Sequence, residues 1–288
     1  TEPMAAVAPD GSPRRVGIVG CGHLGKYLAM QVLQRGGELG LELAFVWNRT
    51  PTALDDPELS LPAELKLLNL DDFATARADL IVEVAHPCIT KDYGAKFLAQ
   101  ADFMIGSPTA LADEDLYTAL LAAATTNGVY IPSGALWGAQ DIQKMARGGK
   151  LKDLTVTMKK HPGSMKLNPP LSGKLAEATT ADGETVLYDG PVRALCAIAP
   201  NNVNTMAAAA IAFGAGGFDK TRGVLVADPS LQEHIVEVLA EGVTAGFQVA
   251  TVRRNPAPVG AVTGTATYAS FCASMQLAKQ RGPGLHLC

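Results

Sequence analysis

Three glycines near the start of the chain have the spacing of a phosphate-binding turn. Gly20, Gly22 and Gly25 follow the apolar run 16–19 and precede a stretch with helical periodicity. In such a turn the first glycine permits a tight bend, the second lets the backbone approach a pyrophosphate, and the third lets helix and strand pack closely. Free N–H groups at the start of the helix would bind the phosphates. We therefore expect this turn, with its intervening residues His23 and Leu24, to bind a dinucleotide, and a purely structural glycine turn is the alternative.

The residues after the second expected strand bear on which dinucleotide would bind. The apolar run 41–47 ends in Asn48-Arg49-Thr50, where NAD-preferring sites usually carry Asp or Glu for the ribose hydroxyls. No carboxylate stands here, and the guanidinium of Arg49 would pair strongly with a 2′-phosphate. The pattern favours NADP over NAD. If the cofactor is NAD, Arg49 stacks on adenine or faces solvent.

The end of the next inner strand should border the nicotinamide. Run 80–84 is followed by Ala85-His86-Pro87, and the carboxyl ends of parallel strands line the cofactor cleft. Ala85 and His86 are therefore candidate cofactor contacts, with His86 alternatively capping the next turn. Glu83 lies within the apolar run and needs hydrogen-bonding partners if it is buried.

Histidine is the side chain best suited to proton transfer near neutral pH. The chain has five, at positions 23, 86, 161, 234 and 286. We expect His23 to point outward from the glycine turn and His286 to lie in a C-terminal tail. That leaves His86, His161 and His234 as candidates, and His234, on an expected strand of the second half, could face the cleft opposite the nicotinamide. A histidine on a solvated strand face is the alternative.

The elements that must position these residues change character halfway along the chain. In the first half, short apolar runs alternate with helical stretches, which predicts a Rossmann-type, doubly wound parallel sheet. The expected strands are 16–19, 41–47, 80–84, 102–105 and 128–131, and the expected helices are 25–35, 93–100 and 113–125. In the second half, several strands alternate apolar and polar residues, which predicts a mixed sheet with one open face. These strands are 154–160, 184–188, 223–227, 233–240 and 247–253, with an Ala-rich helix at 204–213.

This pattern predicts two α/β domains. We expect residues 1–13 to form a flexible tail and 14–140 the dinucleotide-binding domain. Residues 141–263 would form the domain for substrate, catalysis and oligomerisation. A helix within 264–282 would pack back on the first domain.

Composition excludes several classes of function. The 288 residues are 48% hydrophobic with a net charge of −4 and no basic stripe, which argues against nucleic acid as a partner. No apolar run approaches the ~20 residues of a membrane span. The five cysteines are scattered, without CxxC spacing, which argues against a metal site or disulfide framework and for the cytoplasm.

Four longer segments resemble one family, the L-aspartate dehydrogenases. They are IGSPTALAD (105–113), YIPSGALWGAQDI (130–142), LYDGPVRALCAIAPNNVNTMAAAAIA (187–212) and GVLVADPSLQEHIVEV (223–238). The similarity runs in order from about Val16 to Val252. The resemblance implies an NAD(P)-dependent oxidation of L-aspartate to iminoaspartate, which water converts to oxaloacetate and ammonia.

The resemblance also implies roles for individual residues. The loop from Ser133 through Ala135 to Ala139 would border the nicotinamide, and Asn204 would contact the cofactor. His234 matches the family's catalytic histidine. We further expect a homodimer through the sheet of the second domain.

A dicarboxylic amino acid needs fixed cations or donors in its site. Lys160 and His161, in the basic stretch KKHPGSMK, are candidates, as are Arg193 and Ser133. A charge run of this kind can equally be a solvated face. The chain departs from the family pattern near 255–265, at 85–87 and at 161–162. A reductase of another small acid or sugar, or a non-catalytic NADP-binding sensor or scaffold, are therefore the alternatives.

Overall fold

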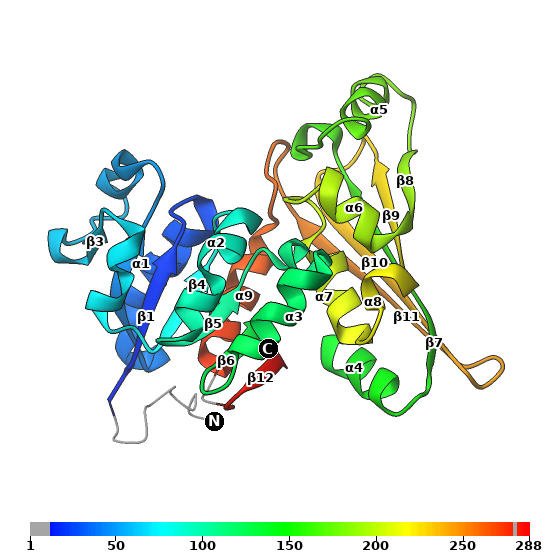
Figure 1. Cartoon of the computed structure of the whole chain (residues 1–288). Coiled ribbons are helices and arrows are strands. Elements are labelled where there is room, and N and C mark those ends of the chain that lie inside the picture. The colour runs from blue at the N-terminus through cyan, green and yellow to red at the C-terminus, as the bar shows by residue number, and fades with distance from the viewer. Residues whose placement is uncertain (1–11, 279–280) are drawn as a thin grey trace.

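The structure is a computed structural model that describes residues 12–278 and 281–288. Nearly all of the expected tail, 1–13, thus lies outside the described residues. The chain forms two β-sheets side by side, each with its own helices, and its last elements, α9 and β12, return to the first sheet (Figure 1). None of the described helices is long and apolar enough to cross a membrane.

The first sheet is parallel and has the order β12-β6-β5-β4-β1-β2-β3. Its strands are β1 (Arg14–Val19), β2 (Leu41–Trp47), β3 (Lys66–Leu67), β4 (Leu80–Glu83), β5 (Asp102–Ile105), β6 (Gly128–Ile131) and β12 (Gly284–Leu287). Every residue of β4, β5 and β6 is buried, because helices cover both faces of the sheet. The doubly wound fold is confirmed, and the strand order reverses between β1 and β4, where a ligand crevice forms in such sheets.

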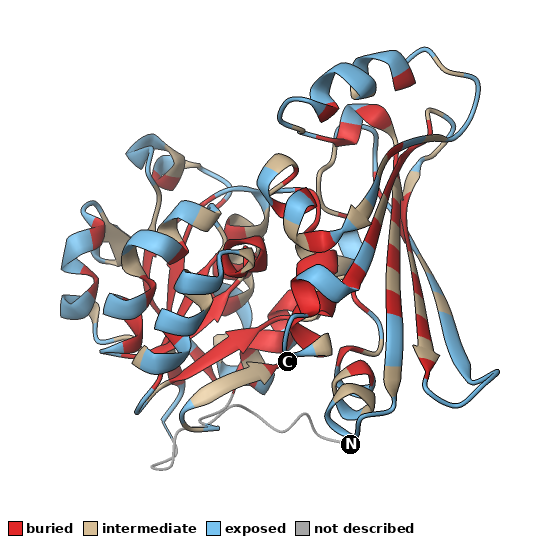
Figure 2. Cartoon of the chain, turned by 45° about the vertical axis from the view of Figure 1, so that its right-hand side comes forward, coloured by how far each residue is buried: buried red, intermediate tan, exposed pale blue. Residues whose placement is uncertain are grey.

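The helices of the first domain each bury part of their surface against the sheet or against one another and leave the rest exposed. They are α1 (His23–Leu39), α2 (Pro87–Leu98), α3 (Glu114–Ala123) and α9 (Thr265–Leu277). Figure 2 shows the buried strands between helices whose outer faces are exposed. Tyr268 of α9 stacks on Tyr27 of α1 with ring centroids 5.3 Å apart, so the end of the chain packs against the glycine-turn helix.

The C-terminal segment is not the tail that we expected. Strand β12 pairs in parallel with β6, with His286 opposite Tyr130. The His286 and Tyr130 rings lie 5.2 Å apart, and Tyr130 Oη accepts a hydrogen bond from Arg281 N at 2.9 Å. Gly282, before this four-residue strand, and Gly284, its first residue, both have positive φ, so the sequence of the strand has little strand character of its own.

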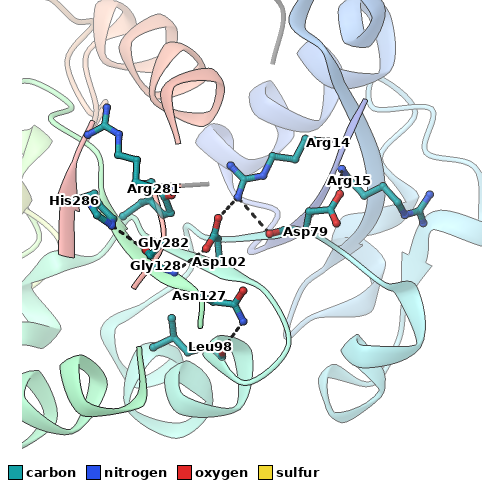
Figure 3. Close-up of polar contacts among 11 residues, drawn as sticks. Arg14, Arg15, Asp79, Leu98, Asp102, Asn127, Gly128, Arg281, Gly282 and His286 are labelled. Atoms are coloured by element: carbon teal, nitrogen blue, oxygen red, sulfur yellow. Dashed lines mark hydrogen bonds and ion pairs between the residues drawn. The ribbon is translucent and has the colours of Figure 1, made fainter. Parts of the chain in front are cut away.

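The amino ends of the strands are tied together by a buried ion pair. Arg14 pairs with Asp102, and Asp102 Oδ1 also accepts a hydrogen bond from Gly128 N at 2.7 Å (Figure 3). Arg14 Nη2 lies 3.3 Å from the carbonyl oxygen of Asp79. These contacts join β1, β5 and β6 at the edge opposite the glycine turn, so they serve the fold rather than the cofactor crevice.

The second sheet is mixed and has the order β11-β10-β7-β9-β8. Its strands are β7 (Leu151–Lys160), β8 (Thr185–Pro191), β9 (Thr221–Ala227), β10 (Glu233–Gly242) and β11 (Gln248–Pro256). The helices beside it are α4 (Ala139–Arg147), α5 (Leu171–Ala178), α6 (Val192–Ile198), α7 (Asn204–Phe213) and α8 (Gly217–Lys220). In β10, Val236, Val238 and Ala240 are buried, whereas the alternate positions Glu237 and Leu239 are half-buried, so one face is more open, as predicted.

Candidate functional site

The glycine turn lies at the carboxyl end of β1. Gly20 has a φ of 115°, and its N–H donates to the carbonyl of Trp47 at 2.8 Å. A Cβ on Gly25 would lie 1.9 Å from the Gly20 carbonyl oxygen, so the fold itself requires a glycine there. A Cβ on Gly22 would meet nothing within 4 Å. Gly22 therefore faces open space at the start of α1.

The start of α1 is free to bind an anion. Gly22 is its N-cap, no side chain caps the helix, and no acidic residue stands in the first turn. His23, the first helical residue, is exposed, and Leu24 turns towards the space between the domains. Free amides and the positive end of the helix dipole favour a phosphate here.

Asn48 and Arg49 have different environments at the end of β2. Asn48 Oδ1 accepts a hydrogen bond from Cys21 N at 3.0 Å, and its Nδ2 donates to the Thr50 carbonyl at 3.0 Å, so this side chain braces the glycine turn. Arg49 is exposed and makes no hydrogen bond or ion pair with the described residues. Its guanidinium is therefore available to a ligand.

Glu83 ties together two loops at the crevice. It is fully buried, and its carboxylate accepts hydrogen bonds from the N–H groups of Ala85 (2.7 Å), His86 (2.9 Å) and Ser107 (3.0 Å). Burial raises the pKa of Glu83 to about 7, although these hydrogen bonds oppose the shift. The partners that the sequence demanded for a buried Glu83 are present.

His86 acts as a helix cap. Its Nδ1 accepts a hydrogen bond from Cys88 N at 3.2 Å at the start of α2, which is the alternative that the sequence left open. Both Ala85 and His86 are exposed, and neither lines the cavity described next.

A cavity between the two domains brings together residues that are far apart in the sequence. Its floor is formed by β7 and β10, and its walls by the loop after β6 and the starts of α7 and α9. Of the residues predicted for the site, it is lined by Leu24, Ser133, Ala135, Lys160, Asn204 and His234. The glycine-turn helix and the expected catalytic strand thus meet at one cavity.

His234 is buried at the floor of this cavity. Its side chain lies on β10, the residue is 6% exposed, and Nε2 has no hydrogen-bond partner among the described residues. Burial, and then the positive charge of Lys160, lower the pKa of His234 to about 4, against a hydrogen bond with the backbone of Ala261. The imidazole is therefore neutral at neutral pH, with one nitrogen free to accept a proton.

Lys160 is the second buried titratable group of the cavity. The residue is 4% exposed, and Nζ donates to the Val262 carbonyl at 3.1 Å. No carboxylate of the described chain forms an ion pair with it, and burial lowers its pKa to about 8. A buried ammonium without an acidic partner favours an anionic ligand.

Two residues that we expected to bind substrate lie elsewhere. Arg193 forms ion pairs with Asp219 (2.7 Å) and Glu114 (3.0 Å), and does not line the cavity. His161 Nδ1 accepts a hydrogen bond from Gly163 N at 3.0 Å, so it caps the turn after β7 instead. The substrate roles assigned to both are withdrawn, because these side chains are already engaged away from the cavity.

The loop after β6 is held by the end of the chain. The N–H and Oγ of Ser133 both donate to the Cys288 carbonyl, at 2.6 and 2.9 Å. Ser133 lines the cavity, but its hydroxyl proton is used here rather than offered to a substrate. Ala139 is buried at the start of α4 and does not line the cavity, so its expected contact with the nicotinamide is not supported.

Asn255 is a cavity residue that the sequence did not single out for the site. It is 2% exposed, Oδ1 accepts a hydrogen bond from Ala266 N, and Nδ2 donates to Thr267 Oγ1 at 3.1 Å. Asn255 therefore anchors the start of α9 to β11 at the cavity wall. Its position two residues after the expected strand 247–253, in the segment that departs from the family pattern, was the available signal.

Comparisons with known proteins agree with this architecture. Residues 141–274 match the family model described as aspartate dehydrogenase, C-terminal, and residues 20–132 match that of the homoserine dehydrogenase NAD binding domain. An aspartate dehydrogenase domain-containing protein of Danio rerio is 50% identical over 277 residues, covering 95% of this chain and 98% of that one. An L-aspartate dehydrogenase of Methanococcoides burtonii is 30% identical, covering 85% of this chain and 89% of the relative.

The chain belongs to the L-aspartate dehydrogenase family. Membership places it among NAD-binding oxidoreductases, as the glycine turn and the resemblance predicted. The crystal structure of aspartate dehydrogenase from Thermotoga maritima has the same fold, with a TM-score of 0.66 at 20% identity, covering 91% of this chain and 93% of that one.

Proposed function

We propose that this protein oxidises L-aspartate to iminoaspartate and hydrates the imine to oxaloacetate and ammonia, with NADP favoured over NAD. The observation that carries the proposal is the interdomain cavity. A free imidazole nitrogen and an unpaired buried ammonium, on His234 and Lys160, face it together.

The residues of the first domain fit a pyridine nucleotide. The open side of Gly22 leaves room for a pyrophosphate, and the uncapped start of α1 would donate to it. Arg49 would pair with a 2′-phosphate, and Ala135 and Asn204 would border the nicotinamide. A bound nicotinamide would accept the hydride from the substrate α-carbon.

The carboxylates of the substrate would bind near Lys160 at the floor of the cavity. Lys160 would bind one carboxylate of the amino acid. The starts of α7 and α9 also reach the cavity, and neither has an acidic residue in its first turn, although Asn255 Oδ1 already accepts one N–H of α9. Together they make the site electropositive, which suits a dicarboxylate.

His234 would move the protons of the reaction. L-Aspartate enters with an α-ammonium group, which must lose a proton before the α-carbon can give up a hydride. The free Nε2 of the neutral imidazole would accept that proton and would later assist the attack of water on the imine. Because His234 is 6% exposed, its ring is largely shielded from bulk water in this role.

The test is turnover of an amino-acid panel with both nucleotides. L-Aspartate with NADP⁺ should give the highest kcat/KM. His234→Ala should abolish turnover while leaving the Kd for NADPH within a few-fold, and His161→Ala, outside the cavity, should retain activity. Full activity in His234→Ala would remove this residue from the mechanism, and nucleotide binding without turnover of any acid would favour a sensor.

We also propose a homodimer through the open face of the second sheet. Val186 and Val252, on β8 and β11, are 56% and 62% exposed, and apolar strand residues of this kind commonly lie in interfaces. Sedimentation should give a dimer that Val252→Asp weakens. A monomer for the unmodified protein would contradict this.

A further inference from the structure

Lys160 and His234 form a pair on neighbouring strands. In the antiparallel ladder of β7 and β10, Lys159 pairs with Ile235, so Lys160 and His234 are the next positions on the two strands. They are 4% and 6% exposed, and both line the cavity. Two titratable side chains therefore share one water-poor space.

A single loop holds both side chains in place. The backbone of Ala261 forms a hydrogen bond with the His234 ring, and the carbonyl of Val262 accepts one from Lys160 Nζ at 3.1 Å. The loop fixes the lysine through a neutral acceptor, so it orients the ammonium without cancelling its charge.

No other charge within the described part of the cavity offsets the lysine. Apart from Lys160 and His234, the residues that line the cavity carry no titratable side chain. Asp228, beside the end of β7, directs Oδ1 to the N–H and Oγ of Ser230, at 2.9 and 2.7 Å. Lys159 pairs with Glu184 and Glu237 outside the cavity.

We propose that Lys160 is a positioning residue that tunes the proton affinity of His234: its ammonium adds to the effect of burial in keeping the imidazole neutral in the empty cavity, and a substrate carboxylate that pairs with Lys160 removes the contribution of the lysine. A positive neighbour disfavours a second positive charge in a low dielectric, and neutralising it removes the penalty. That the bound carboxylate belongs to L-aspartate rests on the proposed function. The effect of the Lys160 ammonium on the proton affinity of His234 does not.

The coupling would make His234 a stronger base when it is needed. The free cavity presents a neutral ring, ready to accept a proton. Once a carboxylate has bound to Lys160, the α-ammonium N–H bond breaks and an N–H bond forms at Nε2. The substrate amine keeps its electron pair, and nothing is oxidised in this step.

The test is an NMR titration of His234 in the full-length protein labelled at its histidines, with the signal assigned from His234→Gln. In the unmodified protein the ring should titrate far below the usual histidine range. In Lys160→Met its midpoint should rise by about one unit or more. Lys160→Arg, which keeps the charge, should retain the low midpoint, and the matched control Lys159→Met should leave it unchanged.

A second arm uses succinate, an unreactive dicarboxylate, and needs no variant. Succinate should raise the His234 midpoint in the unmodified protein but not in Lys160→Met. An unchanged midpoint in Lys160→Met, or bound succinate without a shift, would overturn the proposal. If the protein proves not to oxidise aspartate, the midpoint without ligand still decides the role of Lys160, so the two failures are distinguishable.

Discussion

Two glycines of the glycine turn have different roles: Gly25 is required by the fold, and Gly22 is expected to make room for a ligand. At Gly25 a methyl group would lie 1.9 Å from the Gly20 carbonyl oxygen and 2.8 Å from its carbon, and both contacts are to backbone. At Gly22 the same methyl group would meet nothing within 4 Å, and φ −79°, ψ −169° suits alanine. Gly25→Ala and Gly22→Ala therefore test opposite properties of one loop.

The expected magnitudes follow from these contacts. Gly25→Ala should lower the free energy of unfolding by about 1–3 kcal/mol, because the backbone must move to admit the methyl group. Gly22→Ala should cost less than about 1 kcal/mol, since alanine is only a poorer N-cap than glycine. Its methyl group would instead occupy the space that the pyrophosphate enters. We expect a loss of at least about 100-fold in NADPH affinity, or ~2.7 kcal/mol.

Urea denaturation measures the first property, and titration of NADPH fluorescence measures the second. Gly22→Ala should unfold near the midpoint of the unmodified protein yet fail to bind NADPH. If Gly22→Ala binds NADPH within a few-fold of normal, the assignment of this turn to a dinucleotide is refuted. If it loses as much stability as Gly25→Ala, the space at Gly22 is not open as described.

Three further predictions concern charged residues around the two domains. Arg49→Asp should weaken NADP binding by about 10-fold more than NAD binding, because the guanidinium pairs with the 2′-phosphate, and equal losses would refute that contact. Arg193→Met should lower stability by about 1 kcal/mol through loss of its pairs with Asp219 and Glu114, and should leave the KM for L-aspartate unchanged; a raised KM would return Arg193 to the substrate site. Burial holds the pKa of Glu83 at about 7, above the ordinary 4.5, so the folded state binds the extra proton. The free energy of unfolding should therefore fall as the pH rises from 4.5 to about 7. In urea titrations Glu83→Gln should remove this pH dependence of stability. An unchanged pH dependence would mean that another group causes it.

The strands of the first domain could be predicted well because they are buried on both faces. The runs 41–47, 102–105 and 128–131 coincide with β2, β5 and β6 residue by residue, since such strands read as continuous apolar segments. The Ala-rich helix α7 was likewise predicted at Asn204–Phe213. For these buried strands and this helix, local composition was enough to predict the bounds of the element.

Two elements were missed for different reasons. Helix α4 begins after Gly138, which has a φ of 80° and offers no side-chain cap, but its apolar residues Ala139, Ile142 and Met145 recur at helical spacing, so a local signal was present and was overlooked. Strand β12 has four residues and depends on pairing with β6 rather than on its own composition. Strand β12 therefore forms because of contacts with a distant part of the chain.

The site shows the same division. His234 and Lys160 were predicted, and the structure places both in the cavity. Nothing in the sequence pattern indicated that Arg193 pairs with Asp219 and Glu114, which are 26 and 79 positions away. Nor did it indicate that the Ser133 hydroxyl donates to the Cys288 carbonyl, 155 positions away. The chemistry of a side chain indicates which residues could bind substrate. Hydrogen bonds and ion pairs with distant residues determine which of these side chains remain free to do so.

The most direct test of the proposed reaction is hydride transfer from labelled substrate. The protein is incubated with L-aspartate deuterated at the α-carbon and NADP⁺, and the nucleotide is analysed by mass spectrometry. The proposed reaction should give NADPH that carries the deuterium, formed together with oxaloacetate and ammonia, and none in His234→Ala. NADP⁺ that binds tightly but stays oxidised, or NADPH without deuterium, would contradict it.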